Sequence, residues 1–420
     1  MKERLLLLTR RFPYNRGEVA AESYLETEIS LLANRFDRVL IVATEAPSGD
    51  VPTCALPCNV ESIALGCTPT RVHKISLAVR GVFSTLFAPI EMRKAIATDP
   101  ISTTKRRVFR GYFAARAYEK YYRLIPELKR RSFEPTALYS FWLYDIALAT
   151  LWARETYPCA RAVARAHGYD LYQNRIGMDY LPFREFLLSG LDAVLPCSED
   201  GRTYLATNWP DYSDKLHTSY LGTTDLPDLS ELQCDGVFHI VSCSRAVALK
   251  RVGLIADALA VLDVQGRCVK WTHYGDGPEL ISVKRKCEQF SSVVAEFPGS
   301  VPNMDLLDIY CQDRIDLFVN VSESEGLPIS IMEACGVSAP VLATEVGGTR
   351  EIVHQGLNGF LLPLDLEPYV LASAIIKLMD MPEEDVLNMR RASRRIWENH
   401  FRANSNIEQL VSLLKGGDTA

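Results

Sequence analysis

The chain has 420 residues, of which 48% are hydrophobic and 23% charged, and its net charge is −6. This length is enough for two domains with cores of their own, and the acidic balance argues against a nucleic-acid-binding protein. No apolar run approaches the roughly 20 residues that a membrane-spanning helix needs. Eleven cysteines without a repeated spacing favour a reducing cytoplasm over secretion. We expect no metal site at the closest of them, Cys54, Cys58 and Cys67, because no histidine accompanies them at zinc-ligand spacing.

The first segment predicts a strand, a turn and a helix. Arg4–Thr9 is an apolar strand, and the turn RRFPYNRGE follows it. A helix is expected at 18–34, because apolar residues recur there at i, i+4 and i+7. Gly17 in the turn would let a ligand approach the backbone closely. A second strand is expected at Val39–Ala43.

Residues 71–131 are strongly basic, with 15 Lys and Arg against four Asp and Glu. Aromatic residues alternate with these cations. A basic amphipathic helix of this kind suits an anionic membrane surface, where each cation adds about 1 kcal/mol. A helix with a solvated basic face and an aromatic core side has the same pattern, so both interpretations stay open.

The rest of the first half predicts four more strands. Those at Ala137–Ser140 and Arg161–Ala164 come first, and RAHGYDLY follows the second of them. His167 then stands where a parallel sheet presents its carboxyl edge, which is the usual ligand side of doubly wound folds. A buried histidine with a purely structural role is the alternative. Strands at 192–196 and 217–221 complete this half.

The second half repeats the alternation of strands and helices with short links, which predicts parallel sheets in both halves. A polar segment without a clear period separates the halves and reads as a linker. The segment 383–414 reads as helical, and a polar patch at 404–406 is where it would break. The expected parts are an N-terminal domain, a linker, a C-terminal domain and a final helix at 1–222, 223–236, 237–395 and 396–420.

Two turns of the second half carry candidate ligand contacts. Phe238–Cys243 is an expected strand, and SCSRAVALKR places Arg245 and Lys250 directly after it. Val269–Tyr274 is the next strand, and it ends at a glycine turn that begins with Gly275.

The stretch 320–353 has the strongest pattern in the chain. An apolar strand stops at SESEG, and Pro328 then opens a short buried helix. Such a junction directs free backbone N–H groups and the positive end of a helix dipole at one spot, which suits a phosphate. Glu325 and Glu333 flank this spot, and paired acids beyond a phosphate site match a nucleotide-sugar, which has hydroxyls on both sides of its diphosphate.

This arrangement in SESEGLPISIMEA, followed by PVLATEVGGTREIV and NGFLLP, closely resembles the signature of retaining glycosyltransferases of the GT-B fold, the fourth sequence family (glycosyl transferases group 1). The resemblance is sharpest at 242–363. It implies two Rossmann-like, doubly wound parallel-sheet domains that face each other across a cleft. It also implies transfer from a nucleotide-sugar with retention of anomeric configuration, without a metal or another cofactor, in bacterial surface polysaccharide synthesis.

The resemblance further assigns roles to residues. Arg245 and Lys250 would neutralise the donor diphosphate, Glu325 would bind the transferred sugar and Glu333 the ribose, and His167 would contact the sugar from the opposite domain. The candidate donor-binding residues are Gly17, Arg245, Lys250, Gly275, Glu325, Gly326, Leu327 and Glu333. The candidate catalytic residues are His167, Arg245, Lys250 and Glu325. The chain departs from many relatives at Arg251, where they carry glycine.

Three other functions stay open at this point. A sugar-nucleotide epimerase would share the fold, a glycoside hydrolase would also need two carboxylates, and an idle homologue could act as a subunit of a polysaccharide assembly complex. For a transferase, the basic first domain favours a glycan or lipid-linked acceptor in exopolysaccharide, capsule or lipopolysaccharide synthesis. A cytoplasmic protein is expected, which the basic stretch 71–131 would hold peripherally at the inner face of the cell membrane.

Overall fold

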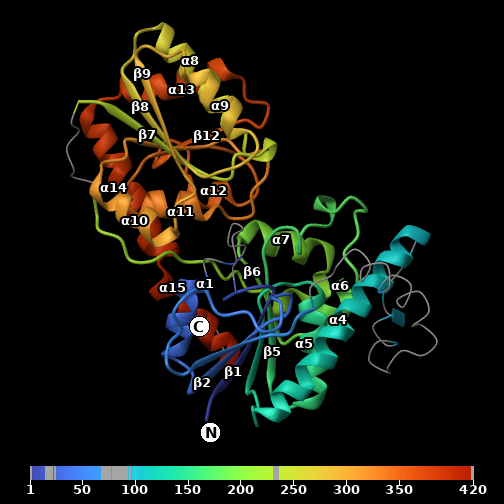
Figure 1. Cartoon of the computed structure of the whole chain (residues 1–420). Helices are drawn as coiled ribbons and strands as arrows, with labels where there is room; N and C mark the ends of the chain where they lie inside the picture. Colours follow the sequence, from blue (N-terminus) through green and yellow to red (C-terminus); the bar gives the residue numbers. More distant parts are fainter. Residues whose placement is uncertain are drawn as a thin grey trace. The chain divides into compact units, whose positions relative to one another are not determined.

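The computed structural model describes residues 2–14, 22, 25–67, 77, 93, 96–97, 99, 101, 103–229 and 236–417. The expected ligand turn at Gly17 and most of the basic stretch before residue 103 lie outside the described residues. The chain forms two compact units: unit 1 is Met1–Tyr220 with Asn406–Ala420, and unit 2 is Leu221–Ser405. Each unit has a six-stranded sheet with helices on both faces (Figure 1).

Unit 1 is built on a wholly parallel sheet of strand order β3-β2-β1-β4-β5-β6. Its strands are β1 (Arg4–Thr9), β2 (Arg38–Ala43), β3 (Val60–Ala64), β4 (Ala137–Ser140), β5 (Arg161–Ala166) and β6 (Ala193–Pro196). The strand order reverses between β1 and β4, the neighbouring central strands. The run Leu5–Leu8 of β1 is fully buried, because a central strand of a parallel sheet is covered on both faces.

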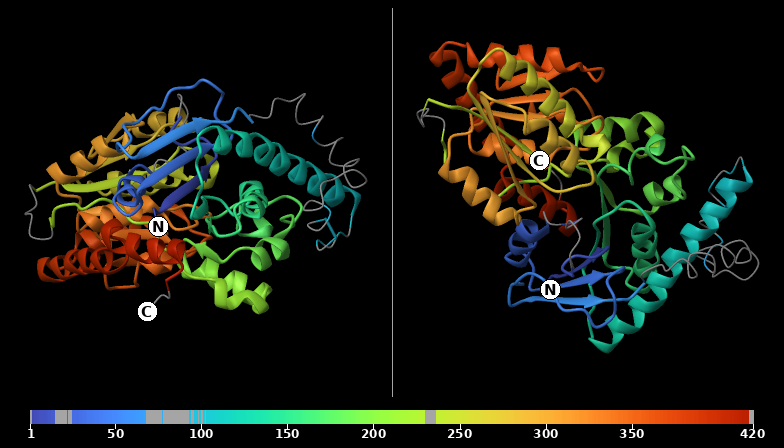
Figure 2. Two further views of the ribbon diagram at one scale, coloured as in Figure 1. Left: turned by 90° about the horizontal axis from the view of Figure 1, so that it is seen from below. Right: turned by 45° about the horizontal axis from the view of Figure 1, so that its top comes forward.

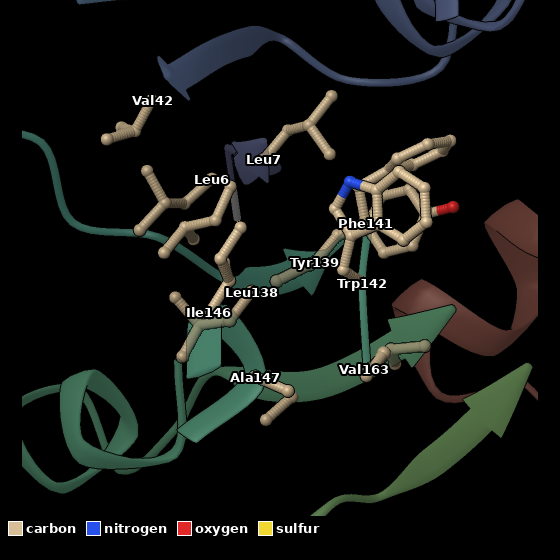
Figure 3. Packing of buried hydrophobic residues seen from close by; sticks show 14 of the residues in the cluster. Leu6, Leu7, Val42, Leu138, Tyr139, Phe141, Trp142, Ile146, Ala147 and Val163 are labelled. Atoms are coloured by element: carbon tan, nitrogen blue, oxygen red, sulfur yellow. The ribbon is translucent and has the colours of Figure 1, made fainter. Parts of the chain in front are cut away.

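Helices cover the two faces of this sheet according to the direction of each crossover. The helices of unit 1 are α1 (Leu25–Ala33), α4 (Thr104–Arg130), α5 (Asp145–Thr156), η1 (Gln173–Arg175), α6 (Arg184–Gly190), α7 (Glu199–Asn208), η2 (Pro210–Lys215) and α15 (Ala403–Lys415). The long helix α4 packs against α5 (Figure 2). Figure 3 shows the core between sheet and helices, where Leu6, Leu138 and Ile146 meet.

Two predictions about unit 1 need correction. Residues 217–221 form no strand: the N–H groups of His217 and Ser219 donate to Val194 and Pro196 of β6, but Pro196 has no N–H to donate in return. Strand β3, which the sequence analysis did not predict, forms the sheet edge beside β2. It combines buried Val60 and Ile63 with exposed Glu61, as expected at a partly covered sheet edge.

The cations of α4 are fewer on the surface than the sequence suggests. Lys120 is 1% exposed, and Arg116 is also largely buried, because both pair with the carboxylates Glu45 and Asp145. The aromatic ring of Phe113 is buried on the same helix. These two charges therefore cannot face a membrane surface.

Unit 2 is a second parallel sheet, of order β12-β11-β10-β7-β8-β9. Its strands are β7 (Phe238–Cys243), β8 (Val269–Tyr274), β9 (Val293–Gly299), β10 (Leu317–Asn320), β11 (Val341–Thr344) and β12 (Gly359–Leu362). Its helices are η3 (Ala248–Lys250), α8 (Val252–Val264), α9 (Leu280–Cys287), α10 (Asn303–Gln312), α11 (Ile329–Gly336), α12 (Thr349–Ile352), α13 (Pro368–Met379) and α14 (Glu383–His400). Helix α8 packs on α13, and α11 packs on α14 (Figure 1). The predicted α/β class with two doubly wound parallel sheets is confirmed.

The segment 383–414 is two helices and not one. α14 ends at His400 and α15 begins at Ala403, so the break precedes the polar patch at 404–406. The polar patch instead lies in the first turn of α15. Across the parts of the chain that the structure describes, no helix combines the length and apolar character needed to cross a bilayer.

Candidate functional site

The loops after β7 and β10 meet at the point where the strand order of unit 2 reverses. β7 and β10 are adjacent in the sheet, yet the chain leaves them toward opposite sides of it. At such a switch point, the two loops part and leave a crevice at the carboxyl edge. Arg245 and Lys250 follow β7, and Glu325 follows β10, so the parallel topology alone brings these predicted residues to one place.

Lys250 and Glu325 are in direct contact. Lys250 Nζ lies 2.6 Å from Glu325 Oε1, and the side chains are 22% and 11% exposed. The amide of Asn320, at the end of β10, donates to the same oxygen at 3.2 Å. Arg245 is exposed, and its guanidinium pairs with no carboxylate among the described residues. Among the described residues, the loop after β7 therefore carries one cation without a carboxylate partner, Arg245, and one that is paired with an acid, Lys250.

Glycines allow the loops of this edge to pack backbone against backbone. Gly275 has φ +138°, and a Cβ atom there would lie 1.9 Å from the carbonyl oxygen of Ser244. A Cβ atom on Gly347 would lie 2.1 Å from the carbonyl oxygen of Glu325, and the N–H of Gly348 donates to Gly326 at 2.8 Å. Gly275 thus has a packing role next to Arg245, and the turn at 347–348 supports the Glu325 turn.

The start of α11 differs slightly from the prediction. Pro328 lies just before the helix, as its N-cap, and Ile329 is the first helical residue. Leu327 is buried in the turn, whereas Gly326 accepts the hydrogen bond from Gly348. Among the predicted donor-binding residues of this turn, Leu327 therefore holds the turn through its side chain and Gly326 through its backbone.

Glu333 lies inside unit 2 and is 4% exposed. Burial raises the pKa of its carboxyl to about 7, and the hydrogen bond from Asn303 Nδ2, at 2.7 Å, acts in the opposite direction. Lys250 and Glu333 both lie close enough to Cys243, the last residue of β7, to shift its pKa, which burial raises to about 12. The structure therefore gathers Lys250 and Glu333 around the end of β7, with Asn303 as the partner that the sequence analysis missed.

His167 follows β5 at the carboxyl edge of the unit 1 sheet, as predicted. It is 8% exposed, and its ring centroid lies 4.4 Å from that of Trp142 and 4.8 Å from that of Phe141. Figure 3 shows the rings of Phe141 and Trp142 together after β4. The backbone N–H of His167 donates to Asp170 at 2.9 Å.

Asp170 is a buried carboxylate that orders this turn. Burial opposes its ionisation, but the interactions with His167 and the hydrogen bond from the N–H of Leu143 outweigh burial and lower its pKa. Asp170 stands only three residues after His167 in HGYD, and this spacing could have indicated that the two residues interact.

Glu22 is a buried acid of unit 1 that no sequence pattern indicated. Its carboxylate is fully buried and accepts three successive backbone N–H groups, those of Arg10, Arg11 and Phe12, at 2.8–2.9 Å. The indole N–H of Trp142 also donates to it, at 2.6 Å. Successive N–H groups that converge in this way form an anion-binding nest. In unit 1 the chain fills that nest with its own acid.

A buried ion cluster lies beside the nest. Glu45 follows β2 and Asp145 begins α5, and Lys120 bridges the two at 3.2 and 2.7 Å. Arg10 also pairs with Glu45, at 2.9 Å. Burial alone would raise the pKa of Glu45, but the charges of Lys120, Arg10 and Arg116 hold it at about 2. No local sequence pattern joins these residues, because they lie on four separate segments.

No group of three or more His, Cys, Asp or Glu side chains that could hold a metal occurs within the described ranges.

Comparisons with known proteins agree with this geometry. Residues 237–381 match the family model described as Glycosyl transferases group 1. The amylovoran biosynthesis glycosyltransferase AmsK of Erwinia amylovora is 24% identical over 59% of this chain and 62% of its own length. The O-antigen biosynthesis glycosyltransferase WbnH of Escherichia coli is 24% identical over 62% of this chain and 73% of its own. The chain thus spans less than two thirds of AmsK.

A solved structure shares the fold over the whole chain. Anabaena Alr3699/HepE in complex with UDP and glucose has a TM-score of 0.62 at 17% identity, covering 99% of both chains. Residues 237–381 thus resemble the glycosyl transferases group 1 family model, and the chain shares the fold of the GT-B glycosyltransferases.

Proposed function

We propose that this chain is a glycosyltransferase that moves a sugar from a nucleotide-sugar to a glycan or lipid-linked acceptor in surface polysaccharide synthesis. The observation that carries the proposal is the contact of Lys250 with Glu325 at the β7/β10 switch point, where the loop after β7 also carries the exposed Arg245. A ligand that presents a diphosphate next to sugar hydroxyls needs cations and an acid side by side. The printed names of AmsK and WbnH support the polysaccharide context.

In this proposal, Arg245 and Lys250 hold the diphosphate. The leaving nucleotide gains charge as the glycosidic bond breaks, and fixed cations stabilise that charge without reorganisation. Glu325 accepts hydrogen bonds from the hydroxyls of the sugar, and its bond to Lys250 keeps it oriented. Glu333 binds the ribose, for which a carboxyl near its titration point can accept or donate a hydrogen bond.

We also propose that transfer proceeds with retention and without a metal, as the family resemblance implies. Arg245 and Lys250 supply the positive charge that a divalent cation would otherwise supply. His167, held by Trp142 and the Asp170 turn, is proposed to contact the donor sugar. We further propose that the protein binds peripherally to an anionic membrane surface, where it would meet its acceptor. Co-sedimentation with anionic vesicles at low salt tests it, and no binding there removes it.

A thermal-shift panel tests the donor site. The ligands are UDP, GDP, ADP, dTDP and CMP with their common sugars, on the wild type and on Lys250→Ala. A ligand at a hundred times its dissociation constant adds about 2.7 kcal/mol of stability, which is a clear rise in melting temperature. We expect one nucleotide class to raise the melting temperature of the wild type, and to raise that of Lys250→Ala less. In a turnover assay, the activation barrier of Lys250→Ala should be higher by about 2–4 kcal/mol.

The matched control is Lys286→Ala. Lys286 is a lysine of the same unit, exposed and paired with Asp257 at 2.6 Å. It should respond to nucleotides like the wild type. If no nucleotide raises the melting temperature of the folded wild type, the donor site is absent, and the idle-subunit function replaces the transferase.

A further inference from the structure

Arg251 lies directly after Lys250 and immediately before helix α8. Its backbone is in the left-handed region, with φ 48° and ψ 38°. That conformation is easy for glycine and unfavourable for other L residues. A glycine would therefore fit this backbone better, and the reason for an arginine must lie in what its side chain does.

The side chain of Arg251 joins two other loops of the same sheet edge. Nε donates to the carbonyl oxygen of Val321 at 2.7 Å, and Nη1 donates to that of Leu364 at 2.7 Å. Val321 is the first residue after β10, and Leu364 is the second after β12. The guanidinium fork reaches two separate carbonyls, which the single ammonium of a lysine could not do in this way.

The segment that Arg251 holds is the one that carries Glu325. Further along this segment, the N–H of Glu323 donates to the carbonyl of Leu249 at 2.8 Å. Arg251 and Leu249 therefore fix residues 321–323 against the loop after β7 from both sides of Lys250. The contact between Lys250 and Glu325 lies next to these hydrogen bonds along the chain.

We propose that Arg251 is a positioning residue of the nucleotide-sugar site, which fixes the 321–325 segment and thereby sets Glu325 opposite Lys250. Its effect on ligands rests on the proposed function, because it assumes that Glu325 faces the sugar. Loss of the guanidinium then weakens a sugar nucleotide more than the nucleoside diphosphate alone, since the diphosphate is held by Arg245 and Lys250.

The variant Arg251→Gly separates this role from a purely conformational one. Glycine adopts the left-handed conformation without strain, so the melting temperature of the variant should equal or exceed that of the wild type. Hydrogen–deuterium exchange of peptides covering 321–327 should become about tenfold faster through local opening, with the rest of unit 2 unchanged. The control is Arg267→Ala, which loses an exposed pair with Asp380 beyond the other end of α8. Exchange at 321–327 that matches the wild type would overturn the proposal.

Binding titrations measure the Kd of the wild type and of Arg251→Gly. The ligands are UDP, GDP and ADP, each alone and as its glucose conjugate. In Arg251→Gly we expect the Kd of the sugar nucleotide to rise about tenfold, as for a lost charged hydrogen bond, and that of the nucleoside diphosphate to change much less. Equal changes for both ligands contradict the role toward Glu325. If the wild type binds none of these ligands, the proposed function fails, while the exchange result still decides whether Arg251 orders the segment.

Discussion

The two units share one topology but use its carboxyl edge differently. In unit 2 the loops at the switch point carry Arg245, Lys250 and Glu325, which are at least partly exposed. In unit 1 the corresponding loop after β1 directs three N–H groups at one spot, but the buried carboxylate of Glu22 accepts all of them. The same topology thus gives an anion nest that the chain fills itself in unit 1 and, in the proposed function, an anion site for a ligand in unit 2.

This difference also concerns how charge is kept inside each unit. Unit 1 buries an ion cluster around Glu45 and Asp145, where each carboxylate has more than one cationic partner. Unit 2 buries Glu333 with a neutral amide as its hydrogen-bond partner. We expect removal of a cation to destabilise unit 1, and removal of a charge to stabilise unit 2.

The largest change in the free energy of unfolding is expected for Lys120→Met in the ion cluster. This change leaves Glu45 and Asp145 buried with less compensating charge, and breaking a buried pair in this way costs about 3–5 kcal/mol. The measurement is the free energy of unfolding in urea. Lys129→Met on the same helix is the control, because Lys129 is exposed. Equal losses in both variants would show that the cluster gives no special stability.

For Glu333→Gln we expect a gain in folding stability that depends on pH. The pKa of Glu333 is about 7 in the folded chain against 4.5 for an ordinary glutamate. A raised folded pKa means that the wild type is fully stable below pH 4.5 and loses stability as pH rises toward 7, by about 3 kcal/mol at most. Glutamine cannot ionise and can still accept from Asn303, so the variant should be the more stable one at pH 8 and equal at pH 4.5.

Urea unfolding at those two pH values measures this gain. Glu296→Gln on the exposed side of β9 is the control and should show no such dependence. A stability difference for Glu333→Gln that is the same at both pH values would mean that the buried carboxyl is not protonated on folding.

The smallest effect is expected for Glu22→Gln. The amide keeps one acceptor oxygen but loses the charge, and it places an NH₂ group against backbone N–H donors. Each hydrogen bond to a charged group contributes about 1.5–3 kcal/mol. Because the amide oxygen still accepts part of these bonds, we expect a net loss of about 2 kcal/mol. Fluorescence of Trp142 would shift as its indole partner changes. Unchanged stability and fluorescence would show that the nest does not need a carboxylate.

Much of unit 2 was predictable because its site is local in sequence. The strand, turn and helix around Glu325 lie within one short stretch, and parallel topology then brings Arg245 and Lys250 to the same edge. The contact of Lys250 with Glu325 spans 75 positions, and the hydrogen-bond partner of the buried Glu333 is Asn303 on another helix. Neither follows from periodicity or spacing.

Unit 1 was less predictable for the same reason. Its charged residues pair across segments that have no shared motif, so the basic stretch gave no sign that Arg116 and Lys120 turn inward. The strand expected at 217–221 had suitable residues, but its neighbour Pro196 could not complete the ladder. Strand pairing depends on the partner as much as on the segment itself.

The return of α15 to unit 1 has a consequence for the order of folding. Ile407, Leu410 and Leu414 belong to the same hydrophobic core as β1 and β4, yet the whole of unit 2 lies between them in the chain. During synthesis, unit 2 can close as soon as its own segments exist. Unit 1 must wait with an uncovered apolar face until α15 has been made, so the unit that begins first is completed last.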